Sequence, residues 1–367
     1  MQAIAPVIEM LQATGKFEIS TYATRESFPV ISKLNLQVAR LDEKVFNADP
    51  VGYTRSIFEA HSPALVLTGS SPARSAAPET PEQFAVLTAR NIDVKSVVVL
   101  DAWHQYKERF CIDPLANQAA PELIPDIVCV LDRLCQNHLQ SLGVPADKLL
   151  ITHNPWLDQV VHDAANPPAA SIELGRDALN VVYVSQPLAE MANIRGWPFT
   201  QQDVFDSLVY ALPPAPFGAR HRIWVWVHPS EDVGRWIGSL TLPRADIEAV
   251  VTEERGVAVL AHVDFVVSSH STVTYEALHY GTPCISLRPG GKNLATLVTD
   301  DLGLSRVFHD KETFKEFLSD AQVMQLRKEL YHHRAELRAS GTFFSGGFAT
   351  KRVVDAIFGV IAPSTLN

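Results

Sequence analysis

Several features that mark particular classes of protein are rare or absent in this sequence. It has four cysteines in 367 residues, and none of them forms a CxxC pair. We therefore expect reduced, mostly buried thiols rather than catalytic or metal-binding cysteines. No apolar run reaches the roughly 18 residues of a membrane-spanning helix. Residues 1–11 lack a basic segment, and Glu9 interrupts their apolar part, so they do not read as a signal peptide. These absences predict a cytoplasmic protein.

Basic residues are also scarce relative to acidic ones. The chain has 31 Lys plus Arg against 41 Asp plus Glu, a formal net charge of −10. Nucleic-acid binding requires a basic surface, so we expect no nucleic-acid partner, although a local pocket can still bind a small phosphorylated ligand. The 13 histidines are scattered, and no suitable loop carries a DxD-type cluster. We therefore expect no metal site and no required cofactor.

What the sequence does contain is a regular alternation of short apolar runs with helix-length amphipathic stretches. The runs expected to form strands are 17–22, 36–41, 64–68, 96–100, 127–131, 149–152, 181–184, 223–227, 257–261, 265–267 and 284–287. Continuous apolar runs of this length suit strands that are covered on both faces. Alternating strands and helices therefore predict an α/β protein with parallel, doubly wound sheets.

The length and the breaks in this pattern predict two Rossmann-like domains. The first spans 1–160 and opens directly in a helix at 2–13, so that the usual first strand and its glycine turn are missing. A linker rich in proline and alanine follows at 161–177. The second domain spans 178–345, and 346–367 is expected to form a final helix.

The most informative segment is an apolar strand that ends in a cluster of hydroxyl side chains. Five hydroxyl residues fall within seven positions, namely Ser268, Ser269, Ser271, Thr272 and Thr274. Ser271 is expected to cap a helix that ends at Gly281. A helix N-terminus at the carboxyl end of a strand favours an anion such as a diphosphate. Glu276, one to two turns further along, is able to accept hydrogen bonds from a ribose diol.

This segment resembles the donor-binding βα unit of GT-B glycosyltransferases and of the related non-hydrolysing nucleotide-sugar 2-epimerases. The resemblance implies that the hydroxyl turn holds the nucleotide phosphates and that Glu276 holds the ribose. It also implies a cleft between the two domains, acceptor binding by the first domain, and a C-terminal helix that crosses back to the first domain. The epimerases carry paired glutamates in this helix. Here Ala277 follows Glu276, which favours a transferase.

A second motif, His228-Pro229, ends another apolar strand. It is similar to the His-Pro motif of bacterial sialyltransferases and related capsule enzymes, which accompanies a Ser-Ser pair such as Ser268-Ser269 and faces a CMP-linked donor. The resemblance implies that His228 contacts the donor phosphate or acts in catalysis. A surface histidine at a strand tip is the alternative reading.

Two further loops supply candidate donor contacts. Ser185 and Gln186 follow the strand expected at 181–184, where an ordinary loop explains them equally well. Arg288 and Lys292 lie in a glycine-rich loop after the strand at 284–287. A cation there is able to stabilise a leaving diphosphate without a metal ion.

In the first domain, the expected strand at 96–100 delivers Asp101 to the sheet edge. Asp101 is the first candidate for the general base that removes a proton from the acceptor hydroxyl, and His104 is the alternative. Trp103 and Tyr106 are candidates for stacking on a sugar ring, and Arg109 for pairing with an anionic group. A capping role for Asp101 and a core position for Trp103 are equally compatible with the sequence.

The sequence therefore predicts a glycosyltransferase that uses a UDP- or CMP-linked sugar and an acceptor glycan, lipid or protein. The alternatives are a nucleotide-sugar 2-epimerase and a non-catalytic subunit that binds nucleotide sugars. The sequence leaves open whether the protein is a homodimer.

Overall fold

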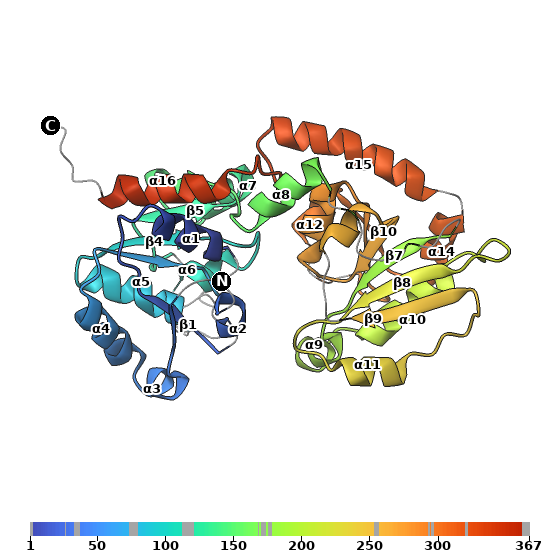
Figure 1. Ribbon diagram of the computed structural model, residues 1–367, viewed down its shortest axis with the longest axis horizontal. Helices are drawn as coiled ribbons and strands as arrows, with labels where there is room; N and C mark the ends of the chain where they lie inside the picture. Colours follow the sequence, from blue (N-terminus) through green and yellow to red (C-terminus); the bar gives the residue numbers. More distant parts are fainter. Residues whose placement is uncertain are drawn as a thin grey trace. The chain divides into compact units, whose positions relative to one another are not determined.

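The computed structural model describes residues 3–25, 27–32, 37–72, 80–111, 121–167, 169, 174, 178–252, 257–292, 294, 297–319 and 322–361. The chain divides into two compact units. Unit 1 comprises Met1–Gln159 and Leu337–Asn367, and unit 2 comprises Val160–Glu336. The chain passes from unit 1 to unit 2 within α8 (Leu157–Ala165) and returns within α15 (Gln322–Ala339) (Figure 1). The first part of the linker expected at 161–177 belongs to α8, and residues 168, 170–173 and 175–177 lie outside the described residues.

Unit 2 contains a six-stranded parallel sheet in the order β12-β11-β10-β7-β8-β9. Its strands are β7 (Asn180–Val184), β8 (His221–Trp226), β9 (Ile247–Thr252), β10 (Phe265–Ser268), β11 (Cys284–Leu287) and β12 (Ser305–Phe308). The chain runs from β7 outward to one edge and then returns to fill the other side from β10 to β12. This is the strand order of a Rossmann fold, and it confirms the predicted doubly wound α/β class. The order reverses between β7 and β10.

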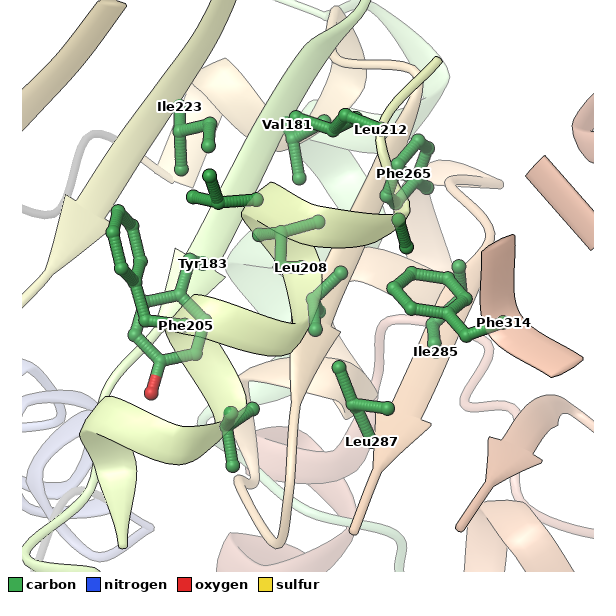
Figure 2. Packing of buried hydrophobic residues seen from close by; sticks show 14 of the residues in the cluster. Val181, Tyr183, Phe205, Leu208, Leu212, Ile223, Phe265, Ile285, Leu287 and Phe314 are labelled. Carbon is green, nitrogen blue, oxygen red and sulfur yellow. The ribbon is translucent and has the colours of Figure 1, made fainter. Parts of the chain in front are cut away.

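The helices of unit 2 cover its sheet. They are α9 (Leu188–Arg195), α10 (Gln201–Ala211), α11 (Val233–Ser239), α12 (Val273–Tyr280), α13 (Val298–Asp301) and α14 (Lys311–Ser319). Figure 2 shows Phe205 and Leu208 of α10 and Phe314 of α14 packed against side chains of the central strands. Burial of each such side chain stabilises the fold by about 1.5–3 kcal/mol, so this core fixes the sheet on which the candidate site is built.

Unit 1 contains two parallel sheets. β1 (Thr21–Ala23) pairs with β2 (Val38–Arg40), and a separate sheet has the order β3-β4-β5-β6. The latter strands are β3 (Leu65–Thr68), β4 (Lys95–Val99), β5 (Ile127–Val130) and β6 (Leu149–Ile151). In a Rossmann order the opening strand lies between the second and fourth strands, here between β1 and β3. The described strands divide into two sheets at this place, and within the described residues none precedes α1 (Ala5–Ala13).

Helices pack around the sheets of unit 1. They are α1, α2 (Phe28–Ile31), α3 (Glu43–Ala48), α4 (Pro50–His61), α5 (Pro81–Asn91), α6 (Tyr106–Phe110), α7 (Arg133–Ser141) and α16 (Ala349–Ile361). The last helix, α16, lies against α1 and β4, where Val353 and Ile357 join the same core as Val7 (Figure 1). Its first turn is held by Asp158, whose carboxylate accepts hydrogen bonds from the amides of Ala349 and Thr350 at 2.9 and 2.7 Å.

The structure differs locally from the pattern expected from the sequence. The run Val257–Ala261, expected as a strand, is a 3₁₀ helix that contacts α12, because a short apolar run has no period that separates strand from helix. The strands β9 and β12 were not expected. They form the two edges of the sheet, and their mixed exposure removes the continuous apolar signal.

Candidate functional site

The sequence-predicted residues of unit 2 lie at or after the carboxyl ends of four neighbouring strands, β11, β10, β7 and β8. The reversal of strand order between β7 and β10 lies at the centre of this set. Gln186, after β7, bridges the reversal: its amide nitrogen donates to the His270 carbonyl at 2.6 Å, and its amide oxygen accepts from the His270 amide at 2.7 Å. Open α/β sheets bind ligands outside such a reversal. The Gln186 amide is committed to holding the turn that follows β10.

A carboxylate that sequence reasoning did not select, Glu231, joins the ends of β7 and β8. It accepts hydrogen bonds from the buried Ser185 hydroxyl at 2.7 and 2.9 Å and from the indole of Trp236 at 3.1 Å. It also accepts from the His228 backbone amide at 3.1 Å. Ser185 therefore faces Glu231, and both residues hold the His228 loop in place. The only sequence signal for Glu231 was its position three residues after His228.

The His228 side chain is oriented by the same loop. Ser230 approaches Nδ1 of the imidazole through its hydroxyl at 2.8 Å and through its amide at 3.2 Å. A backbone amide can only donate, so Nδ1 is an acceptor and the neutral ring carries its proton on Nε2. The half-buried imidazole thus has an N–H donor on the nitrogen that Ser230 does not engage.

Behind the β10 turn lies a buried ion pair between Arg288 and Asp300. Their side chains are each 2% exposed, and Nη2 of Arg288 lies 2.5 Å from Oδ2 of Asp300. Nε of Arg288 donates to the Ser269 carbonyl at 2.9 Å, and the Ser269 hydroxyl donates to the Leu287 carbonyl at 2.8 Å. These contacts fasten the turn after β10 to the end of β11. Arg288 and Ser269 contact the protein interior at this turn.

The turn leads into α12 with a tight first turn. The Ser271 hydroxyl accepts from the Val273 amide at 3.2 Å, and the Tyr275 amide donates to the Thr272 carbonyl at 2.9 Å. Thr272, rather than Ser271, occupies the N-cap position, with φ −69°. The amides of Ser271 and Thr272 have no acceptor among the described residues. They are the donors that the helix N-terminus offers to an anion.

The donor-site candidates therefore form two layers. Ser185, Ser268, Ser269, Ser271 and Arg288 are buried and build the turns. Thr272 and Lys292 are exposed, while His228, Gln186 and Glu276 are half-buried. Of the buried group, the Ser271 amide has no acceptor among the described residues, whereas the amides of Ser185 and Arg288 donate to the carbonyls of Trp226 and Phe308 at 2.9 and 2.8 Å.

In unit 1, a buried arginine organises the carboxyl ends of β3 and β4. Nη1 of Arg109 lies 2.9 Å from Oδ1 of Asp101 and donates to the hydroxyl of Ser70 at 2.8 Å and to its carbonyl. Nε of Arg109 donates to the His104 carbonyl at 3.1 Å. The Asp101 side chain is 41% exposed and remains accessible. Burial lowers the pKa of His104, and the nearby Arg109 charge lowers it further.

The aromatic residues next to Asp101 do not form a sugar platform. The Trp103 ring stacks on Phe343 with centroids 5.1 Å apart, and its indole nitrogen donates to Asp132 at 2.9 Å. The Tyr106 hydroxyl lies 3.1 Å from the sulfur of Cys135. Both rings are buried, so the sugar-stacking prediction for Trp103 and Tyr106 is wrong. Their polar atoms are satisfied inside the fold, as buried aromatic side chains require.

Other expectations concern metals, membranes and thiols. Among the described residues no group of three His, Cys, Asp or Glu side chains is arranged to hold a metal ion. No helix in the described part of the chain is both long and apolar enough to cross a membrane. The four cysteines are buried and unpaired, and burial raises the pKa of Cys129 to about 12. The Cys129 thiol is therefore protonated and unreactive near neutral pH.

Solved structures resemble this chain over nearly its whole length. UDP-GlcNAc 2-epimerase from Neisseria meningitidis bound to UDP-GlcNAc has a TM-score of 0.66 and 14% identity, with 98% of this chain and 96% of that chain covered. The glycotransferase of kitacinnamycin has a TM-score of 0.59 and 16% identity, with 98% and 95% covered. MurG from Acinetobacter baumannii has a TM-score of 0.55 and 13% identity, with 97% and 95% covered.

No family model and no curated protein matches the sequence itself. At identities this low, the structural similarity bears on the fold. Nucleotide-sugar enzymes share this architecture of two Rossmann-like parts, and the predicted fold class is confirmed. The chain has the GT-B fold.

Proposed function

We propose that this protein is a glycosyltransferase that binds a UDP- or CMP-linked sugar on unit 2 and transfers the sugar to an acceptor hydroxyl. The observation that carries the proposal is the reversal of strand order between β7 and β10, flanked by the amides of Ser271 and Thr272. Open α/β sheets bind nucleotides at such a reversal, and these amides match a diphosphate or phosphate.

The accessible side chains around this point have complementary roles. His228 donates a hydrogen bond from Nε2 to a donor phosphate, and Lys292 supplies a mobile positive charge for the leaving nucleotide. Glu276, in the first turn of α12, accepts hydrogen bonds from the ribose. Ser185, Gln186, Ser269 and Arg288 hold the loops that carry these groups. The reaction requires no metal ion under this proposal.

Asp101 of unit 1 is the proposed general base. It follows a buried strand, and its side chain is the more accessible member of the Arg109 pair. A carboxylate held in this way can remove the acceptor proton as the sugar transfers. His104 is the alternative base, because its lowered pKa keeps the imidazole neutral near pH 7.

A second candidate function is nucleotide-sugar 2-epimerisation. It is supported by the full-length likeness to the Neisseria meningitidis structure, which is named as a UDP-GlcNAc 2-epimerase bound to UDP-GlcNAc. The single glutamate of α12, which Ala277 follows, supports transfer instead.

Incubation with UDP-, CMP- and GDP-sugars separates the candidates. Nucleotide release that depends on an acceptor supports a transferase, whereas interconversion of sugar epimers, followed by NMR, supports an epimerase. Nucleotide-sugar binding with neither reaction supports a binding subunit. Absence of binding to every nucleotide and nucleotide sugar would refute the proposal.

Substitution at Thr272 tests the phosphate site itself. Its φ of −69° matches the angle that proline requires, so Thr272→Pro removes the amide donor while keeping the local backbone angle. Thr272→Ala is the matched control, because it removes the hydroxyl and keeps the amide. We expect Thr272→Pro to weaken binding of the nucleoside diphosphate but not of the bare nucleoside, and Thr272→Ala to change neither. If Thr272→Pro and Thr272→Ala bind the nucleoside diphosphate with equal affinity, the Thr272 amide does not contact its phosphates.

A further inference from the structure

Arg109 is a heavily engaged charged side chain at the carboxyl edge of the unit 1 sheet. Its side chain is 3% exposed and contacts two loops: Ser70 after β3, and both Asp101 and the His104 carbonyl in the loop between β4 and α6. A buried guanidinium presents its donors in a fixed planar fork. The fork therefore sets the relative positions of the two loops, one of which carries both candidate bases.

The contact with Asp101 engages only one carboxylate oxygen. Oδ1 accepts from Arg109 at 2.9 Å, while Oδ2 has no hydrogen-bond partner within the described part of the chain. A carboxylate fixed through one oxygen presents the second in a constant direction. Such orientation is what a general base requires, since a displacement of about 1 Å is able to lower a rate on the order of 10²-fold.

We propose, building on the function proposed above, that Arg109 is a positioning residue that aims Oδ2 of Asp101 at the acceptor. The charged groups that face His104 are Arg109 and Asp101, whose effects on the imidazole oppose each other. Burial and the Arg109 charge lower the pKa of His104, and the Asp101 charge raises it. The Arg109 charge therefore also favours the uncharged form of the His104 imidazole beside Asp101.

Two variants separate the geometry of Arg109 from its charge. Arg109→Lys keeps the charge, but a single ammonium cannot contact Ser70, Asp101 and the His104 carbonyl together. Arg109→Met removes the charge as well. Arg90→Met is the matched control, because Arg90 is an exposed arginine of the same unit whose guanidinium donates to the Glu122 carbonyl. Circular dichroism and urea unfolding establish that each variant is folded.

The kinetic readout compares the effect of each variant on kcat with its effect on the KM for the nucleotide sugar. We expect Arg109→Lys and Arg109→Met to lower kcat on the order of 10²-fold with an unchanged KM, and Arg90→Met to leave both values unchanged. Added guanidinium ion should restore part of the rate to Arg109→Ala. A wild-type rate in Arg109→Lys would overturn the positioning role.

The second readout is independent of activity. In the folded protein, NMR titration of His104 should give a lowered midpoint in the wild type and in Arg109→Lys, and a higher midpoint in Arg109→Met. An unchanged midpoint in Arg109→Met would overturn the role of Arg109 toward His104. If no nucleotide sugar is turned over, the proposed function fails, whereas the titration still reports on Arg109.

Discussion

The buried Arg288–Asp300 pair gives a prediction whose size follows from the structure. Arg288→Met keeps much of the side-chain length but removes the charge that faces Asp300. The Asp300 carboxylate would then retain the Ser286 hydroxyl at 2.7 Å and the Leu297 amide at 3.0 Å as donors. Because both partners are 2% exposed, water does not replace the lost guanidinium. Removal of one partner from a buried pair costs about 3–5 kcal/mol.

Urea unfolding of unit 2 measures this loss. Unit 2 contains four of the six tryptophans, Trp197, Trp224, Trp226 and Trp236, so fluorescence reports mainly on this unit. The control is Arg306→Met, which breaks a pair with Glu329 whose side chains are 51% and 48% exposed. Exposed pairs contribute about 0–1 kcal/mol, so this variant should unfold nearly as the wild type does.

A second substitution is expected to restore part of the unfolding free energy that Arg288→Met loses. When Arg288→Met is combined with Asp300→Asn, neither member of the pair is charged, and the new side-chain amide oxygen still accepts from one of the two donors. The double variant should therefore be more stable than Arg288→Met alone. An unfolding free energy of Arg288→Met equal to that of the wild type would refute the reasoning. If Arg288→Met unfolds like the wild type but binds the nucleotide more weakly, the result would support direct contact between Arg288 and the leaving diphosphate, as the sequence predicts.

Three further predictions concern individual side chains. Glu276→Ala should weaken nucleotide binding by roughly ten- to a hundredfold, since a charge-assisted hydrogen bond contributes about 1.5–3 kcal/mol; calorimetry with unchanged affinity would remove Glu276 from the site. Asp101→Asn should lower kcat by about 10²–10⁴-fold with the nucleotide Kd unchanged; a full rate here and a loss in His104→Ala would make His104 the base. Burial lowers the pKa of His153 from 6.5, and the Arg352 charge lowers it further. Below about pH 6.5, His153 therefore binds a proton in the unfolded chain that it does not bind in the folded chain. The stability of unit 1 should therefore fall as the pH drops below this value, and His153→Asn, which tolerates the observed φ of 66°, should reduce that slope in urea unfolding at several pH values.

The central strands were readable from the sequence because of how they are buried. Cys284–Leu287 was predicted with its observed bounds, since every residue of β11 is buried and apolar runs of this kind lie between layers of helices. The start of α5 carries a similar local signal, because a Thr80 capping box and a proline lie at its first turn. Gly281, with φ 81°, marks the end of α12 as expected.

Pairings that depend on tertiary structure were not readable in this way. Glu231 and Asp300 lie 46 and 12 residues from the side chains that they bind, Ser185 and Arg288. No local pattern distinguishes such a carboxylate from a solvated one. The same limit applies to Arg109 of α6, whose anionic partner is Asp101 in the preceding loop.

The hydroxyl cluster after β10 has a physical explanation that its composition alone did not give. The Ser269 hydroxyl donates to Leu287, the Ser271 hydroxyl accepts from Val273, and the Thr274 hydroxyl donates to the Ser271 carbonyl at 2.6 Å. These side chains therefore satisfy backbone groups of the turn and of its neighbour, while the Ser271 and Thr272 amides find no acceptor in the part of the chain that the structure describes. A turn fixed by its own hydroxyl groups holds these two amides in one geometry, so that binding an anion requires little further ordering. The hydroxyl groups of Ser269, Ser271 and Thr274 thus explain part of this serine and threonine density through contacts within the protein.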